Sequence, residues 1–246
     1  MTFILSVIIC GVSYSQVKPS SRYIAGTTPV GFESEINDFL KQDSASFPPP
    51  GVVLFAGSST IRKWSNLADD FKEIRVIRRG FGGSTMEALN YYMNDIVLPY
   101  SPAVIVVYEG DNDLAAGVTP DKLIARCDTF IARVHRRLPH TTIWFMSVKP
   151  SFARRHLIPS QAATNKGLKK LAGKRRRTKF IDITRVMYDA SGKLRKDLFE
   201  PDSLHVNSEC YRLWAAHMKK TMLSKQHGPT CNRKTSDLHE DKTQER

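Results

Sequence analysis

The sequence lacks any hydrophobic run of the roughly 18–20 residues that a membrane-spanning helix needs. It therefore does not predict an integral membrane protein. Cysteine is scarce as well, with four residues in 246, and their spacing gives neither a Cys-x-x-Cys pair nor a zinc pattern. No Asn-x-Ser/Thr sequon is present. Cys127 lies on the apolar side of a predicted helix, so we expect a small buried hydrophobic residue there rather than half of a disulfide.

Acidic residues are also in deficit, since 24 Asp and Glu face 37 Lys and Arg and leave a net charge of +13. The excess gathers in four segments, at residues 75–79, 133–137, 154–155 and, most densely, from Lys166 to Lys179. A basic field of this kind favours anionic partners such as phospholipid surfaces, acidic polysaccharide or nucleic acid. We expect the region Lys166–Lys179 to bind an anionic surface, and we expect no binding to a specific nucleic acid. The alternative is a solvated basic face that keeps the protein soluble.

The first 16 residues carry no charged side chain and contain an apolar run from Phe3 to Ile9. Small residues follow, and the segment predicts a secretory signal peptide cleaved near Ser15, hence a secreted or periplasmic protein. A merely apolar N-terminus is the alternative. Residues 17–50 are expected to form a lead-in with one helix, residues 51–223 a single domain, and residues 224–246 a disordered polar tail.

Short runs of branched apolar residues alternate with helical patterns through the central part of the chain. Each apolar run is followed by a turn or helix signal, which is typical of buried parallel strands. The predicted strands cover residues 52–55, 75–77, 103–107, 142–146 and 180–183. The predicted helices cover residues 32–40, 84–92, 119–138, 160–171 and 208–223. In the helix at 119–138, Thr119 is the predicted N-cap and Pro120 the first helical residue. This alternation predicts a three-layer α/β/α sandwich around a five-stranded parallel sheet.

Polar residues follow the predicted strands, where ligands bind in open parallel sheets. They lie in Ser58-Ser59, in Gly80-Phe81-Gly82-Gly83, in Gly110-Asp111-Asn112-Asp113 and in the later segment Asp202-Ser203-Leu204-His205. A serine hydroxyl needs a neighbouring base, usually a histidine held by a carboxylate. The three-residue spacing of Asp202 and His205 suits such a pair, with Ser59 as nucleophile.

Acyl transfer also needs hydrogen-bond donors for the oxyanion. The backbone N–H groups of Gly83 and Ser59 and the side-chain amide of Asn112 are candidates. Other readings of the same residues exist. Ser84 is a rival nucleophile, but its spacing from Glu87 favours a helix cap. Asp111 and Asp113 resemble two metal ligands, yet no Cys or His lies near them, and no metal is expected.

Two further assignments stay open. Asp202 and His205 taken alone would more often form a surface turn than a catalytic pair. Lys149 follows a predicted strand at the same edge of the sheet and is a candidate lining residue of the site.

Four segments, in this order along the chain, resemble the sequence blocks of the GDSL/SGNH hydrolases. They are Val53-Leu54-Phe55-Ala56-Gly57-Ser58-Ser59-Thr60, Arg79-Gly80-Phe81-Gly82-Gly83-Ser84, Gly110-Asp111-Asn112-Asp113 and Asp202-Ser203-Leu204-His205. The resemblance covers about residues 50–220 and implies the flavodoxin-like SGNH fold. Two positions depart from the family pattern: Ser58 stands where the family has Asp, and Arg78 where it often has Asn. The Gly-x-Ser-x-Gly elbow of α/β-hydrolases is absent.

The resemblance implies catalytic roles for Ser59, Asp202 and His205, and an oxyanion hole formed by Ser59, Gly83 and Asn112. It implies a cofactor-free carboxylic-ester hydrolase that forms an acyl-serine intermediate. Substrates of the family range over lysophospholipids, acetyl esters, acetylated sugars and aryl esters. An acyltransferase using the same triad is the alternative. A catalytically dead polyanion-binding module is a third reading, against which the presence of all five residues argues.

Overall fold

The computed structural model describes residues 31–224, so the predicted signal peptide and most of the predicted polar tail lie outside the described residues. The described chain begins with helix α1 (Glu33–Ala45), which the sequence predicts from 32 to 40. No helix within residues 31–224 is long and apolar enough to cross a bilayer.

Five parallel strands form one sheet in the order β2-β1-β3-β4-β5. They are β1 (Val53–Gly57), β2 (Val76–Gly80), β3 (Val104–Tyr108), β4 (Thr142–Met146) and β5 (Thr178–Ile181). Val53 of β1 pairs with Val76 of β2 and with Val104 of β3, so the three strands end level with one another. The predicted five-stranded parallel sheet is thus confirmed.

The position of β5 differs from the prediction of residues 180–183. The strand ends at Ile181 because Asp182 starts a 3₁₀ turn (η3, Ile183–Met187). The Asp182 carboxylate accepts hydrogen bonds from the backbone N–H and the hydroxyl of Thr184, at 3.0 and 2.6 Å. An Asp side chain that binds the backbone two residues on favours a turn over a strand.

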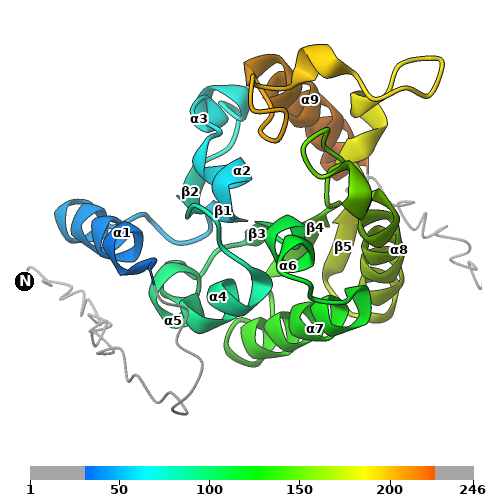
Figure 1. Ribbon diagram of the computed structural model, residues 1–246. Helices are drawn as coiled ribbons and strands as arrows, with labels where there is room; N and C mark the ends of the chain where they lie inside the picture. The colour runs from blue at the N-terminus through cyan, green and yellow to red at the C-terminus, as the bar shows by residue number, and fades with distance from the viewer. Residues whose placement is uncertain (1–30, 225–246) are drawn as a thin grey trace, which may run out of the picture.

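Helices cover both faces of the sheet and give three layers (Figure 1). One face carries α4 (Met86–Tyr91), α5 (Met93–Ile96), α7 (Pro120–Arg137) and α8 (Ile158–Lys174). The other carries α2 (Ser59–Arg62), α3 (Leu67–Asp70) and α9 (Ser208–Ser224). The short α6 (Asp111–Ala115) and three 3₁₀ turns, η1 (Leu98–Tyr100), η2 (Arg155–Leu157) and η4 (Lys196–Leu198), complete the described elements.

Helix α7 begins as the sequence predicts. The Thr119 hydroxyl accepts the N–H of Lys122 at 3.4 Å, and Pro120 occupies the first helical position. Its apolar stripe is buried against the sheet, and Cys127 within that stripe is 3% exposed and free.

An aromatic cluster packs α9 onto the sheet and onto the segment after β1. Trp64 stacks on Tyr211 with ring centroids 4.9 Å apart, and Trp214 meets Tyr211 edge-on at 5.6 Å. Because Tyr211 and Trp214 are fully covered by this packing, the start of α9 has a fixed position, and with it the loop that enters the helix.

The predicted helix cap at Ser84 is wrong. The N-cap of α4 is Thr85, whose side chain accepts the N–H of Ala88 at 3.3 Å. Ser84 is instead fully buried, and its hydroxyl donates to the Glu109 carboxyl at 2.5 Å. Thr85 is the N-cap because it has the extended backbone of a cap residue. The Ser84 hydroxyl binds the buried carboxyl of Glu109 instead, a strong acceptor that the sequence pattern does not reveal.

Glu109 is an ionisable group within the core. Burial raises the pKa of Glu109 well above its usual range; nearby Asp113 adds to this, and the Ser84 hydroxyl opposes it. A folded chain therefore holds this proton more tightly than an unfolded one. The resulting stabilisation is complete below about pH 4.3, the ordinary glutamate value, and is lost as the pH rises through the folded-state pKa.

We predict that Glu109→Gln becomes progressively more stable than the wild type as the pH rises from about 5 to about 8. The amide cannot ionise, yet its oxygen can still accept the Ser84 hydroxyl. Urea unfolding of both proteins across this pH range measures the difference. A stability difference that is constant with pH would show that Glu109 does not change its protonation on folding.

Candidate active site

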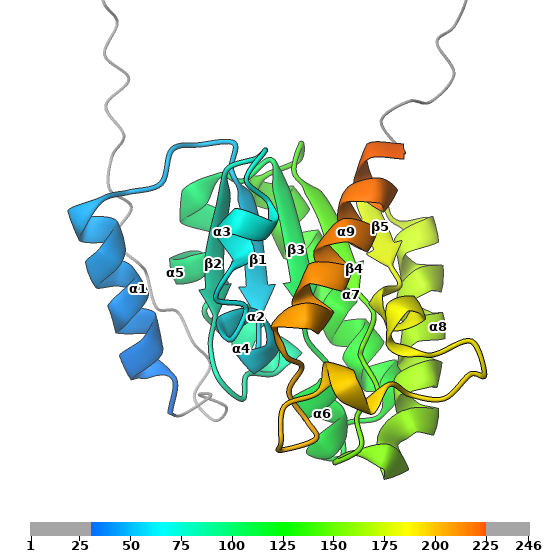
Figure 2. The ribbon, with the colours of Figure 1, turned by 90° about the horizontal axis from the view of Figure 1, so that it is seen from above.

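Ser59 stands at the carboxyl edge of the sheet because β1 and β3 approach closely there. A Cβ atom on Gly57 would lie 2.0 Å from the carbonyl oxygen of Tyr108, so only glycine fits. The N–H of Ser58 donates to the same Tyr108 carbonyl at 3.2 Å. The chain then turns directly into α2, whose first residue is Ser59. Figure 2 shows α2, α6 and the loop before α9 at the end of the sheet to which the strands point.

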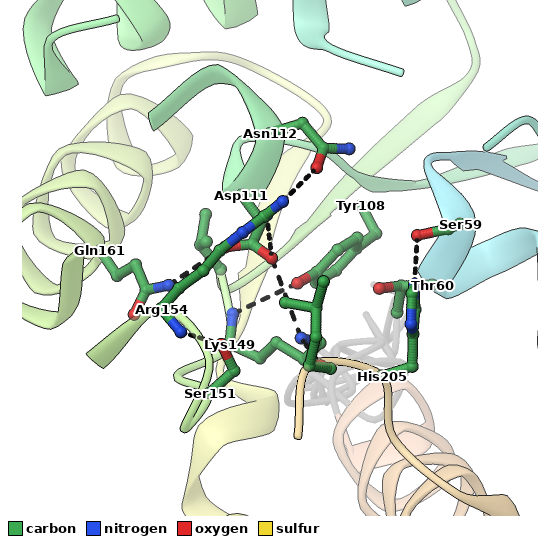
Figure 3. A network of polar contacts seen from close by, with 12 residues as sticks. Ser59, Thr60, Tyr108, Asp111, Asn112, Lys149, Ser151, Arg154, Gln161 and His205 are labelled. Atoms are coloured by element: carbon green, nitrogen blue, oxygen red, sulfur yellow. Dashed lines mark hydrogen bonds and ion pairs between the residues drawn. The ribbon is translucent and has the colours of Figure 1, made fainter. Parts of the chain in front are cut away.

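The structure brings Ser59, His205 and Asp202 together in a hydrogen-bonded chain. The Ser59 Oγ lies 3.0 Å from His205 Nε2 (Figure 3). On the other side of the ring, His205 Nδ1 lies 2.5 Å from Asp202 Oδ2. This arrangement assigns a proton on Nδ1, donated to the carboxylate, and leaves Nε2 able to accept the serine proton.

The Asp202 carboxylate is held in its charged form. Its second oxygen accepts the backbone N–H groups of Leu204 and His205 at 2.9 and 2.8 Å. Burial by itself would raise the pKa of Asp202, but these bonds and the His205 side chain together hold it well below its usual value. An anion on this side of the ring favours the His205 orientation seen here and stabilises the imidazolium once it forms.

The His205 loop is fixed by backbone contacts on both sides. The N–H of Glu200 donates to the His205 carbonyl at 2.8 Å, and Ser203 adopts a left-handed conformation with φ of 57°. The Lys149 ammonium donates to the Leu204 carbonyl at 2.6 Å. A further bond ties α9 to α2, the helix that begins with Ser59, since the Tyr211 hydroxyl donates to the Thr60 carbonyl at 2.8 Å.

The predicted oxyanion donors are the N–H groups of Gly83 and Ser59 and the side-chain amide of Asn112. Gly83 is exposed, has φ of +78°, and its N–H, like that of Ser59, has no acceptor among residues 31–224. The Asn112 amide is oriented by its neighbours: Nδ2 donates to the Ser84 carbonyl at 2.9 Å, and Oδ1 accepts from Arg154 at 3.0 Å. One of the two Nδ2 hydrogens remains for a ligand.

A buried polar network connects Asn112 to the His205 loop (Figure 3). Its centre is Asp111, whose carboxylate meets Arg154 Nη1 at 2.8 Å, Gln161 Nε2 at 3.1 Å and Lys149 Nζ at 3.9 Å. Burial lowers the pKa of Lys149, the charge of Asp111 opposes that shift, and Arg154 adds to it. The Asp111 carboxylate thus pairs with both Arg154, which orients Asn112, and Lys149, which binds the Leu204 carbonyl.

The remaining candidates have other contacts. Ser84 is closed off from solvent in the core, which excludes it as a nucleophile in this conformation. Asp111 and Asp113 have separate partners. Asp113 binds Arg126 at 3.0 Å and the N–H of Met86 at 2.9 Å, whereas Asp111 binds Arg154. Lys149 lies beneath the His205 loop, so its predicted position at this edge is confirmed.

Nothing in the sequence marks Arg154, Gln161 and Glu109 as residues of this region. Arg154 lies 42 positions after Asn112, and Gln161 lies 50 positions after Asp111. No local spacing connects such residues; only the parallel strand order brings their loops to one edge.

Solved structures with this fold include several esterases and lipases. A GDSL-like lipase from Bacteroides thetaiotaomicron is 20% identical with a TM-score of 0.61, covering 77% of this chain and 98% of that one. A carbohydrate esterase family 3 protein from Talaromyces cellulolyticus is 13% identical with a TM-score of 0.58, covering 71% and 97%. A variant of an acetyl-xylooligosaccharide esterase from Geobacillus is 14% identical with a TM-score of 0.57, covering 70% and 94%. Among curated protein sequences, none matches this chain.

The strongest likeness is to a family rather than to a single protein. The model of the GDSL-like lipase/acylhydrolase family matches residues 49–213, which include Ser59, Asp202 and His205 as well as Gly83 and Asn112. The same range contains the whole five-stranded sheet. The chain therefore belongs to the GDSL-like lipase/acylhydrolase family and is a hydrolase that acts on ester bonds.

Proposed function

We propose that the protein is a serine-dependent carboxylic-ester hydrolase that works through an acyl-serine intermediate on Ser59. One observation carries the proposal: Ser59, His205 and Asp202 form a continuous hydrogen-bonded chain on one side of the serine oxygen. The Gly83 loop and Asn112 lie next to one another, since Asn112 Nδ2 donates to the carbonyl of Ser84, the residue after Gly83, at 2.9 Å. A nucleophile between its base and a set of oxyanion donors suits acyl transfer.

The geometry supports a two-step reaction. The Ser59 Oγ attacks the ester carbonyl carbon while His205 Nε2 takes the hydroxyl proton, and the carbonyl oxygen becomes an oxyanion facing Gly83 and Asn112. The C–O bond to the alcohol then breaks, and His205 returns the proton to the departing alkoxide. In the second step His205 removes a proton from water, the hydroxide attacks the acyl-serine, and Ser59 leaves with the proton from His205.

The substrate classes that we propose are acetylated sugars, other acetyl esters and lysophospholipids. We put acetylated sugars first in this proposal because two of the structural neighbours are named for acetylated or carbohydrate substrates. Transfer of the acyl group to an alcohol in place of water would use the same residues.

The first prediction from the proposed function identifies the nucleophile. Ser59→Ala should abolish hydrolysis of p-nitrophenyl esters of graded acyl length, because no other hydroxyl meets His205 Nε2 among the described residues. The matched control is Ser84→Ala, which removes a neighbouring hydroxyl that is bonded to Glu109. It should retain most of kcat while losing about 1–3 kcal/mol of stability, because the Glu109 carboxyl loses its partner. An active Ser59→Ala protein would refute the assignment.

The second prediction concerns the oxyanion. Asn112→Ala should lower kcat about 100-fold, roughly 3 kcal/mol, with little change in KM, because the donor acts only once negative charge has developed. Asn112→Asp should be at least as damaging, since a carboxylate would repel the oxyanion. Steady-state kinetics and melting temperatures of both variants decide the matter. Loss of stability with unchanged kcat would make Asn112 a structural turn residue.

We further propose that the basic region Lys166–Lys179 binds an anionic surface. Lys166, Lys170 and Lys174 are exposed at four-residue intervals along α8, a helix without Asp or Glu. The adjoining arginines Arg176 and Arg177 line a hollow of about 210 Å³ together with His135 and Pro139 at the end of α7. The Arg177 carbonyl also accepts the N–H of Ile143 near the start of β4. This part of the region therefore lies at the end where the strands begin, whereas Ser59 lies at the end to which they point.

The third prediction tests that surface with phosphatidylserine-containing vesicles and with neutral phosphatidylcholine vesicles as the control. Replacing Lys166, Lys170 and Lys174 together by Gln keeps the helix propensity. It should weaken binding to the anionic vesicles by about 3 kcal/mol, roughly 100-fold, at low salt. The kcat on a soluble ester should stay unchanged, because the active site lies at the other edge of the sheet. Equal binding of both proteins would leave the lysines as a solvated face.

A further inference from the structure

Helix α1 lies before the residues that match the family model, yet it contacts the loop that carries Gly83. We propose that α1 is part of the active site and that Glu35 is a positioning residue, which holds the Gly82–Gly83 segment in place for oxyanion binding. The inference rests on the function proposed above, because it assigns the Gly83 N–H to the oxyanion.

The Glu35 carboxylate makes two contacts that meet at the site. It accepts the N–H of Gly82 with both oxygens, at 3.0 and 3.2 Å. It also pairs with the Arg62 guanidinium at 3.0 Å. Arg62 is the last residue of α2, the helix that begins with Ser59. One carboxylate thus joins the oxyanion loop to the nucleophile helix.

The loop depends on such an outside contact because two of its residues have no side chain. A Cβ atom on Gly82 would lie 2.6–2.7 Å from the Arg62 guanidinium, so Gly82 makes room for the arginine that Glu35 binds. Gly83 has open space around its Cα and a positive φ of 78°. Glycine permits many backbone conformations, and a hydrogen bond to the preceding peptide selects among them.

The amino side of the same loop is also held by α1. Arg79, the residue before Gly80, forms a buried ion pair with Asp43 of α1 and donates to the Tyr100 hydroxyl at 2.6 Å. The Tyr100 hydroxyl donates in turn to Asp43 at 2.5 Å. The Arg79 guanidinium lies between the rings of Phe39 and Tyr100, 5.0 and 4.9 Å from their centroids. Two acids of α1 therefore hold the segment at both ends.

The two anchors differ in burial, and so we expect them to differ in effect. The side chains of Asp43 and Arg79 are 9% and 7% exposed, so removing one partner leaves a buried charge and should loosen the fold. The Glu35 side chain is 29% exposed and its partner Arg62 is 49% exposed. Such a pair adds little to stability, so Glu35 can be replaced without unfolding the protein. Its loss should appear in catalysis.

The test compares Glu35→Ala with Glu35→Gln in the full-length chain. Glu35→Ala should lower kcat for a p-nitrophenyl ester about tenfold, less than the roughly 100-fold loss of a complete donor, with KM and melting temperature nearly unchanged. Glu35→Gln should recover most of the activity, because its amide oxygen can still accept the Gly82 N–H. Asp38→Ala is the matched control: Asp38 lies on the exposed side of α1, 61% exposed, near Lys41.

Hydrogen–deuterium exchange supplies a readout that does not depend on activity. The Glu35→Ala change should speed exchange in the peptide covering residues 80–84, while Asp38→Ala should not. If the wild type hydrolyses no ester while the exchange changes as expected, the proposed function fails and the loop contact stands. Unchanged exchange in Glu35→Ala, unchanged kcat in an active enzyme, or equal losses in Glu35→Ala and Glu35→Gln would each overturn the proposal.

Discussion

The close contact between the carboxyl ends of β1 and β3 is the constraint on which the site depends. Gly57 has no room for a Cβ atom against the Tyr108 carbonyl, and this carbonyl also accepts the N–H of Ser58. β1 ends at Gly57, and Ser59 follows two residues later at the start of α2. Because β1 lies between β2 and β3, the loops that carry Gly83 and Asn112 leave the sheet from the two strands beside β1. The strand order thus brings both loops to the end of the sheet where Ser59 lies.

The histidine side of the site is held differently, by charges in a poorly hydrated region. The His205 loop is irregular, and its position comes from the Lys149 ammonium on the Leu204 carbonyl and from the aromatic packing of α9. A buried lysine costs free energy unless it is paired and hydrogen-bonded. Asp111 compensates both Lys149 and Arg154, and Arg154 orients Asn112. The His205 loop and Asn112 are therefore linked through one carboxylate.

Helix α1 extends this scheme beyond the residues shared with the family. It binds the segment from Arg79 to Gly82 through Asp43 and Glu35, and its Phe32 meets Phe81 edge-on at 5.2 Å. A single helix thereby contacts both the end of β2 and the loop that follows it. The segment that leads to Gly83 is held by α1 and also by β1, since the N–H of Phe81 donates to the Gly57 carbonyl at 2.9 Å.

The sequence by itself determined the sheet and the chain of residues around Ser59. Short runs of branched apolar residues that alternate with helical patterns are typical of buried parallel strands, and parallel strands send their carboxyl ends to one edge. Hence Ser59, Gly83, Asn112 and the Asp202–His205 pair could be named from their positions after strands, and Asp202 and His205 are close enough in sequence to pair locally.

Only the tertiary structure decided which polar groups meet across the fold. Glu35 with Gly82, Ser84 with Glu109 and Arg154 with Asn112 are separated by 47, 25 and 42 positions. Their pairing depends on how α1, α4 and the loop before α8 pack, and long-range contacts leave no periodic mark in the sequence. Ser84 shows the consequence: its spacing from Glu87 predicts a local cap, but a buried carboxyl needs a donor more than an exposed helix end does, because water can satisfy only the latter.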